Sequence, residues 1–193
     1  MTERLILAFG DSLTAGFGLY PTESFPARLE ARLHAEGEED TRVFNAGLSG
    51  DTTTGGRLRL PHVLSMFRAR PHLAILELGA NDMLNRHDPR LCEANLGAML
   101  ALFRDHEVPV ILAGMYAAPL LGRDYVEAFN AIYPRLAEAH GVPLYPFFMD
   151  GVVMKPELLL ADRLHPNAVG ADVIARNISP VVLGELRRLA SLR

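Results

Sequence analysis

Short apolar runs recur along the chain at intervals of about thirty residues, and the segments between them show helical periodicity. Several runs are continuous rather than alternating, which is typical of strands that are covered on both faces. Pro71, Pro109 and Pro143 stand at or just before three of the runs and mark junctions between a helix and a strand. The predicted strands are Leu5–Phe9, Val43–Ala46, Leu73–Leu78, Val108–Met115 and Val142–Tyr145.

Two of the intervening segments give clear helix predictions. One carries an apolar stripe with helical spacing, and it predicts a single helix with Asp124 as the N-cap and Gly141 as the stop. The stripe consists of Tyr125, Ala128, Phe129, Ile132 and Leu136. A last helix is predicted from Ala168 to about Leu189, and we expect Pro180 to bend or interrupt it.

Strands and helices alternate with short connections, which favours a parallel sheet with helices on both faces. With 193 residues and no repeat, linker or low-complexity segment, the chain reads as one domain over residues 1–193. The predicted fold class is α/β, a three-layer α/β/α sandwich of about five parallel strands.

Composition excludes several kinds of partner. The net charge of -4 and the lack of a basic run argue against nucleic acid, and the single cysteine, Cys92, rules out an internal disulfide. The run Leu5–Phe9 is too short to span a bilayer or to form a signal-peptide core. We therefore expect no stable membrane insertion, a monomer or weak homo-oligomer, and a cytoplasmic location, or a periplasmic or secreted one if a signal peptide was removed.

The chemistry is expected at one edge of the sheet. In open α/β sheets ligands bind beyond the carboxyl ends of the strands, so the loops after the predicted strands are the place to search. Glycine stands beside small polar side chains in three of these loops, and an Asp-His pair precedes the last helix. The segments are Gly10–Ser12, Asn45–Asp51, Gly79–Asp82, Met115–Pro119 and Asp162–Asn167.

These residue types suit acyl transfer. A serine becomes a useful nucleophile when a histidine takes its proton and a carboxylate orients that histidine. Ser12 lies just past the first strand, while Asp162 and His165 are three apart, with Pro166 as the expected first helical residue. Asn81 offers an amide donor and Gly50 an approachable backbone N–H. Taken singly, each has a plainer interpretation, since serine and aspartate often cap helices and Asn-Asp pairs form turns.

Four segments together resemble the GDSL, or SGNH, hydrolases. They occur in the family's order, and the likeness runs the whole length, nearest to the bacterial multifunctional thioesterase/lysophospholipase/arylesterase group. Residues 127–134 and 142–149 are particularly similar to that group. The four segments are Gly10–Leu13, Ser49–Thr52, Gly79–Asp82 and Asp162–Asn167.

The resemblance implies a role for each matching residue. Ser12 is expected as nucleophile and oxyanion donor, His165 as general base and Asp162 as its orienting carboxylate; Gly50 and Asn81 complete the oxyanion hole, although Gly47 is an alternative to Gly50. The resemblance also implies a flavodoxin-like fold, no cofactor and no metal, and hydrolysis of carboxylic esters and acyl thioesters through an acyl-Ser12 intermediate. The acyl chain is expected along Met83–Asp88 and Met115–Leu120. The expected substrate contacts are Asp11, Met83, Leu84, Met115 and Pro119.

Two other functions stay open at this point. A carbohydrate O-deacetylase is possible because related families use the same segments, although the lack of Trp and only 7% aromatic residues argue against a sugar-stacking platform. A non-catalytic phosphate- or nucleotide-binding module is the second alternative, but the first loop carries neither common phosphate-binding glycine motif. The chain also lacks the G-x-S-x-G nucleophile elbow of α/β-hydrolases and a zinc-type histidine pair.

Overall fold

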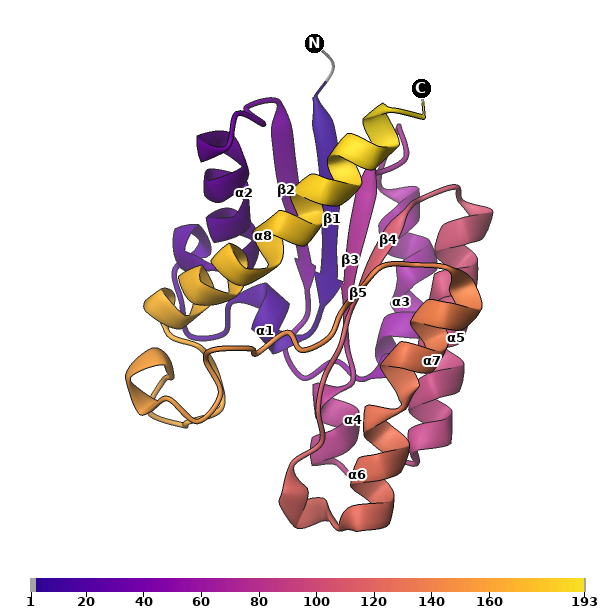
Figure 1. The fold of residues 1–193 in the computed structure, drawn as a ribbon, viewed down its shortest axis with the longest axis vertical. Helices are drawn as coiled ribbons and strands as arrows, with labels where there is room; N and C mark the ends of the chain where they lie inside the picture. Colours follow the sequence, from indigo (N-terminus) through magenta and orange to yellow (C-terminus); the bar gives the residue numbers. More distant parts are fainter. Residues whose placement is uncertain (1–2, 193) are drawn as a thin grey trace.

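The fold is built on a parallel five-stranded sheet with the strand order β2-β1-β3-β4-β5, seen in a computed structural model that describes residues 3–192 (Figure 1). Each strand overlaps one of the predicted apolar runs, and helices cover both faces, so the predicted three-layer α/β sandwich is confirmed. The strands are β1 (Arg4–Gly10), β2 (Thr41–Gly47), β3 (Leu73–Glu77), β4 (Val110–Ala113) and β5 (Leu144–Tyr145).

The core lies along the two central strands. Residues 6–9 of β1 and all of β3 are buried, as the continuous apolar runs predict. Each fully buried large aliphatic or aromatic side chain contributes about 1.5–3 kcal/mol, so these strands anchor the domain. The edge strand β2 has only Thr41 and Ala46 buried, and its Phe44 lies partly in solvent.

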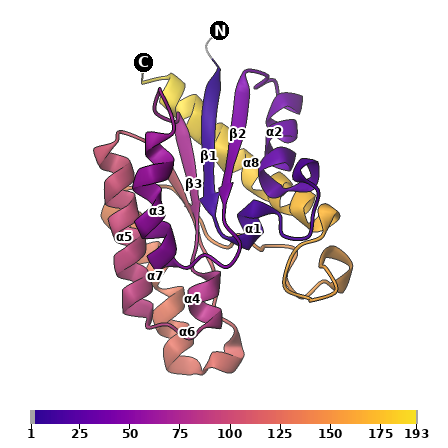
Figure 2. The same cartoon turned by 180° about the vertical axis from the view of Figure 1, so that it is seen from behind.

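The helices form two layers around the sheet. Figures 1 and 2 show α1, α2 and α8 on one face, and α3, α5 and α7 on the other. The helices are α1 (Ser12–Ala15), α2 (Phe25–Ala35), α3 (Thr53–Ser65), α4 (Ala80–Leu84), α5 (Pro89–Asp105), α6 (Arg123–Asn130), α7 (Ile132–His140) and α8 (Ala168–Ala190). Single 3₁₀ turns occur at η1 (Pro21–Glu23), η2 (Pro119–Leu121) and η3 (Pro156–Leu158).

The helix predicted between Asp124 and Gly141 is two helices, so that prediction was wrong. Helix α6 ends at Asn130 and α7 begins at Ile132. Pro134 explains the break, because it has no N–H to donate to the carbonyl of Asn130 four residues earlier. Asp124 lies inside the first turn of α6, where Gly122 is the N-cap, while Gly141 ends α7 in the left-handed conformation as predicted.

The last helix departs from the sequence predictions at two prolines, Pro166 and Pro180. Helix α8 continues through Pro180 without interruption. The proline leaves the carbonyl of Arg176 without its helical donor, and the Ser179 hydroxyl supplies one at 3.0 Å. The helix begins at Ala168 as predicted, because the Asn167 side chain caps it by accepting the N–H groups of Val169 and Gly170. Pro166 lies before this cap, so the expectation that it is the first helical residue was wrong.

Candidate active site

The first loop places Ser12 at the start of a helix beyond the carboxyl end of β1. Asp11 caps this helix, and its Oδ1 accepts the N–H of Leu13 at 2.9 Å. The preceding Gly10 has no room for a side chain, since a Cβ there would collide with the Thr14 hydroxyl and the Glu77 carboxyl. The sequence Gly-Asp-Ser therefore lets the chain turn tightly from strand to helix, with Ser12 at the turn.

A continuous chain of hydrogen-bond contacts runs from Ser12 through His165 to Asp162. The Ser12 Oγ lies 2.9 Å from the His165 Nε2, and the His165 Nδ1 lies 2.7 Å from the Asp162 Oδ2. Hydrogen bonds from the His165 ring and from the backbone N–H groups of Leu164 and His165 lower the pKa of Asp162 to about 2. The Phe17 ring packs against the imidazole with 4.4 Å between centroids. The structure thus brings together the three residues that the sequence predicted to act together.

The turn that carries Asp162 and His165 is held by the aspartate itself. Its Oδ1 accepts the N–H groups of Leu164 at 2.9 Å and of His165 at 3.0 Å. Arg163 between them adopts a left-handed backbone conformation with φ of 57°. The carbonyl of His165 accepts the N–H of Leu160 at 2.8 Å, which closes the turn before α8. An Asp three residues before a His therefore forms a rigid turn that fixes both side chains.

The two glycines of the second loop, Gly47 and Gly50, lie in different surroundings. Gly50 has a φ of 81° and lines the cavity beside Ser12, with no heavy atom within 4 Å of a Cβ at that position. Gly47 is packed beneath α1, where a Cβ would collide with the Ala15 backbone, and its N–H donates to the Asn45 side chain at 2.9 Å. Gly50 therefore has a backbone that faces the cavity, while the N–H of Gly47 is already engaged.

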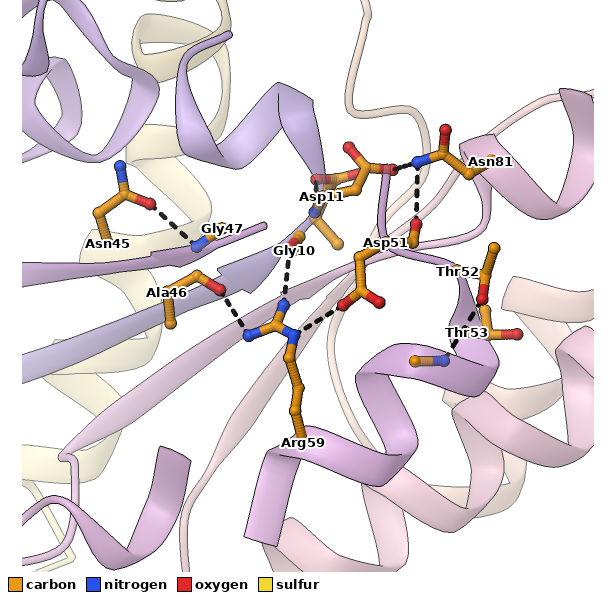
Figure 3. A network of polar contacts seen from close by, with 12 residues as sticks. Gly10, Asp11, Asn45, Ala46, Gly47, Asp51, Thr52, Thr53, Arg59 and Asn81 are labelled. Atoms are coloured by element: carbon orange, nitrogen blue, oxygen red, sulfur yellow. Dashed lines mark hydrogen bonds and ion pairs between the residues drawn. The ribbon is translucent and has the colours of Figure 1, made fainter. Parts of the chain in front are cut away.

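Asn81 uses its side-chain amide to join the first and second loops. The amide nitrogen donates to the Asp51 carbonyl at 2.8 Å and to the Asp11 Oδ2 at 3.2 Å (Figure 3). The Tyr133 hydroxyl donates to the carbonyl of Leu78 at 2.8 Å and so steadies the end of β3 just before this loop. Asn81 is thus held at the cavity wall next to Gly50.

Buried carboxyl groups lie directly beneath these loops. Burial raises the pKa of Asp11 to about 7, with the nearby Asp51 and Asp82 adding to the effect. Burial and the neighbouring Asp11 also raise the pKa of Glu77 well above its usual range. The Glu77 carboxyl accepts the Thr14 hydroxyl at 2.8 Å. Both groups therefore keep their protons to a higher pH in the folded protein than an exposed carboxyl group does.

The proposed reacting residues open onto an apolar cavity of about 630 Å³. Four of the expected substrate contacts, Met83, Leu84, Met115 and Pro119, line this cavity. The fifth, Asp11, does not line it: the residue is fully buried, and its carboxylate is occupied by Leu13 and Asn81. Among residues 3–192 the cavity lining contains no carboxylate, and it includes the cationic side chain of Arg163 from the turn between Asp162 and His165.

Several residues at the site were missed by the sequence predictions. Arg59 lies beneath the second loop, with its guanidinium 2.6 Å from the Asp51 carboxylate. Phe17 and Met154 line the cavity from segments that carry no motif. Arg59 had one available signal, its place in the helix directly after the Ser-Gly-Asp-Thr segment, whereas nothing in the sequence marked the other two.

No helix among residues 3–192 is both long and apolar enough to cross a membrane. In the same part of the chain, no cluster of three or more His, Cys, Asp or Glu residues is arranged to hold a metal ion.

The chain is similar over most of its length to known esterases and thioesterases. The arylesterase of Vibrio mimicus is 37% identical over 185 residues, which is 96% of this chain and 90% of that protein. Thioesterase 1/protease 1/lysophospholipase L1 of Escherichia coli (strain K12) is 36% identical, over 92% of this chain and 84% of that protein. The crystal structure of AlinE4, an SGNH-hydrolase family esterase, superimposes with a TM-score of 0.82 at 42% identity, over 96% of this chain and 98% of that one.

The family assignment rests on most of the chain. Residues 8–173 match the GDSL-like Lipase/Acylhydrolase family, and this range contains all four of the segments that form the site. Neither the O-deacetylase nor the non-catalytic binding module is supported by the comparisons. The chain belongs to the GDSL-like lipase/acylhydrolase family and is a serine hydrolase of the SGNH type.

Proposed function

We propose that this SGNH-type serine esterase hydrolyses carboxylic esters and acyl thioesters through an acyl intermediate on Ser12. The observation that carries the proposal is the unbroken contact from the Ser12 Oγ to the His165 Nε2 and from the His165 Nδ1 to the Asp162 carboxylate. A weakly nucleophilic hydroxyl needs such a base, and the base needs such a carboxylate.

In the first step the Ser12 oxygen attacks the carbonyl carbon and passes its proton to the His165 Nε2. Asp162 stabilises the imidazolium and holds its Nδ1–H, which fixes the direction in which Nε2 points. The tetrahedral intermediate collapses when the leaving oxygen or sulfur takes the proton from Nε2. Ser12 then carries the acyl group, and the alcohol or thiol departs.

In the second step a water molecule attacks the acyl-Ser12 carbonyl and gives its proton to the His165 Nε2. The intermediate collapses to the carboxylic acid, and the Ser12 oxygen recovers its proton from the same nitrogen. His165 therefore serves as base and acid in turn, without net proton uptake. The Phe17 ring packed on the imidazole supports this role by limiting the ring's movement.

Three donors would stabilise the negative oxygen of each tetrahedral intermediate. They are the backbone N–H groups of Ser12 and Gly50 and the side-chain amide of Asn81. All three residues line the same cavity, so one carbonyl oxygen can meet donors from three loops. The longer of the two hydrogen bonds that Asn81 donates, 3.2 Å to Asp11, is the one that an oxyanion replaces most easily.

The cavity supports a preference for uncharged acyl groups of short to medium length. Its walls are methionine, leucine and aromatic side chains, among them Met83, Met115 and Phe147. Burying the methylene groups of an acyl chain there is favourable by about 0.8 kcal/mol each. Among residues 3–192 the lining offers no carboxylate to a positively charged chain and only the Arg163 guanidinium as a permanent cation to a negatively charged one. Small-molecule esters and thioesters fit this site.

Two measurements test the proposal. A profile of kcat/KM over acyl chains of two to about sixteen carbons, as aryl esters and as CoA thioesters, should peak at short or medium lengths. Intact-mass spectrometry after rapid mixing with a slow aryl ester should show a mass increase equal to one acyl group, located on Ser12. An acyl group found on another residue, or equal rates at all lengths, would contradict the proposal.

The remaining expectations concern the whole protein. We propose a single domain over residues 1–193 that is a monomer or weak homo-oligomer. We also propose a cytoplasmic location, or a periplasmic or secreted one where a signal peptide has been removed. Light scattering after size exclusion tests the first point, and fractionation of the native host tests the second.

A further inference from the structure

We infer that Arg59 is a positioning residue. From beneath the cavity, it fixes the relative positions of the three donors of the proposed oxyanion hole. The inference rests on the proposed function, because it concerns how the donors of that hole are held. Arg59 itself does not line the cavity, so it contacts no substrate.

The guanidinium of Arg59 meets three different segments at once. Its Nε donates to the Asp51 carboxylate at 2.6 Å, one terminal nitrogen to the Ala46 carbonyl at 2.9 Å, and the other to the Gly10 carbonyl at 2.9 Å (Figure 3). Its face stacks on the Phe9 ring, 3.9 Å from the centroid. The side chain is only 19% exposed, so these hydrogen bonds and the Phe9 ring together restrict its position.

Two of these contacts, to Gly10 and Asp51, lead to the proposed donors. Gly10 stands two residues before Ser12, at the turn from β1 into α1. Asp51 directly follows Gly50, and its own backbone carbonyl accepts the Asn81 amide at 2.8 Å. Arg59 therefore touches the loop of the Ser12 and Gly50 donors directly and reaches Asn81 through Asp51.

The contact to Ala46 fixes the other end of the second loop. Ala46 lies in β2 next to Phe9 of β1, so the guanidinium bridges the carboxyl ends of two paired strands. The Gly10 carbonyl also accepts the N–H of Leu48 at 3.0 Å, which ties the second loop to the first a second time. A shift of the guanidinium would therefore move the two loops relative to each other.

Only arginine fits this place, because it presents several N–H groups in one rigid plane and always carries its charge. A lysine would keep the charge that faces the buried Asp51 carboxylate, but one ammonium cannot meet three acceptors spread around a plane. Oxyanion donors act through their exact placement, since they must already point at the oxygen when its charge develops. Losing the planar contacts of the guanidinium should therefore lower kcat.

The experiment compares Arg59→Lys and Arg59→Ala with the natural enzyme in the hydrolysis of an aryl butyrate, with rates normalised to sites titrated by a fluorophosphonate. The expected result is a fall in kcat of roughly 10- to 100-fold, below the loss for removing a donor outright, with KM changed by less than about threefold. Arg57 lies on the same helix and is exposed, so Arg57→Lys is the matched control and should stay within about twofold. If Arg59→Ala does not fold, the same kcat and KM measurements on Arg59→Lys and Asp51→Asn test the inference.

A double-mutant cycle separates positioning from mere support of the fold. If Arg59 acts through the hole, Arg59→Lys should cost much less in kcat when Asn81 is already alanine. Guanidinium added to Arg59→Ala should also restore part of kcat. Losses that multiply independently, a change confined to KM, or full turnover per titrated site would overturn the inference. Failure of the proposed function would show separately, as esterase activity that persists in Ser12→Ala.

Discussion

Asp162 contacts His165 twice, with a different carboxylate oxygen each time. Its Oδ2 lies 2.7 Å from the ring Nδ1, and its Oδ1 accepts the backbone N–H of the same histidine at 3.0 Å. The aspartate thus sets both the backbone turn and the orientation of the imidazole. The pKa of Asp162, lowered to about 2, shows that the folded protein favours its ionised form.

Asp162→Asn should reduce kcat by roughly 10³–10⁴-fold while the protein stays folded. The amide oxygen can still accept the backbone N–H groups, so the turn survives, but an amide N–H facing Nδ1 favours the wrong tautomer. The measurement is kcat for an aryl ester together with the melting temperature. Asp172→Asn, which removes a surface ion pair with Arg32, is the control and should retain nearly full activity. A loss of less than about tenfold for Asp162→Asn would contradict the role given to Asp162.

Asn81→Ala should lower kcat by roughly 10²–10³-fold, which is the usual loss for a single oxyanion donor. Because the donor acts when charge develops, KM should change little. Asn85, at the end of the same helix, is exposed and lies outside the cavity lining, unlike Met83 and Leu84 of the segment expected along the acyl chain, so Asn85→Ala is the control variant. Steady-state kinetics on both variants test this, and an effect confined to KM would make Asn81 a substrate contact instead.

Asp11 should make the folded state less stable as the pH rises from about 4 to about 7. Its pKa is about 7 in the folded protein, against an ordinary value of 3.8, so the folded state binds the proton more tightly. The stabilising contribution is therefore complete below the ordinary pKa and is lost as the pH rises through 7. The buried Glu77 acts in the same direction, while Asp162 acts oppositely and only as the pH falls toward 2.

Urea denaturation of the natural protein and of Asp11→Asn across this pH range tests the point. The natural protein should lose more unfolding free energy between pH 4 and 7 than the variant does, since the variant retains only the contribution of Glu77 and of groups elsewhere. Parallel curves for the two proteins would mean that Asp11 titrates normally in the folded state.

Met115→Trp should shift the enzyme toward shorter acyl chains. Met115 follows β4 and lines the cavity, so a larger side chain occupies space that the distal methylene groups of a long chain need. We expect kcat/KM for chains of eight or more carbons to fall by roughly tenfold or more, with butyrate changed by less than about threefold. Met66→Trp is the control, because Met66 is exposed at the end of α3. An unchanged length profile in Met115→Trp would place the acyl chain elsewhere.

The strands and the location of the site were predicted well from the sequence, because each depends on a simple physical requirement on residue type. Short apolar runs predicted all five strands, and the continuous runs marked the buried strands β1 and β3 most clearly, because a buried parallel strand needs apolar side chains on both faces. The four motif segments predicted a site at one edge because parallel strands end together. The resemblance favoured Gly50 over Gly47 in the second loop, and the structure adds a physical reason, since Gly47 is packed against Ala15 and Gly50 lines the cavity.

Predictions failed where the structure at a position depends on a particular hydrogen bond that the residue pattern does not show. The helix expected from Asp124 breaks at Ala131, a position with no local signal other than Pro134 three residues on. Pro180 is tolerated because Ser179 satisfies the carbonyl that the proline leaves without a donor. Asp11, expected at the substrate, faces inward because Leu13 and Asn81 both donate to it. Arg59 was missed because its three acceptors come together only in the folded chain.

The central claim is that Ser12 is the attacking nucleophile, and the hydrolysis of p-nitrophenyl butyrate by Ser12→Ala tests it most directly. We predict that the variant folds, binds substrate and loses activity by at least about 10³-fold, because no other hydroxyl lies within hydrogen-bond reach of the His165 Nε2 among residues 3–192. A Ser12→Ala enzyme that keeps most of its activity would contradict the account.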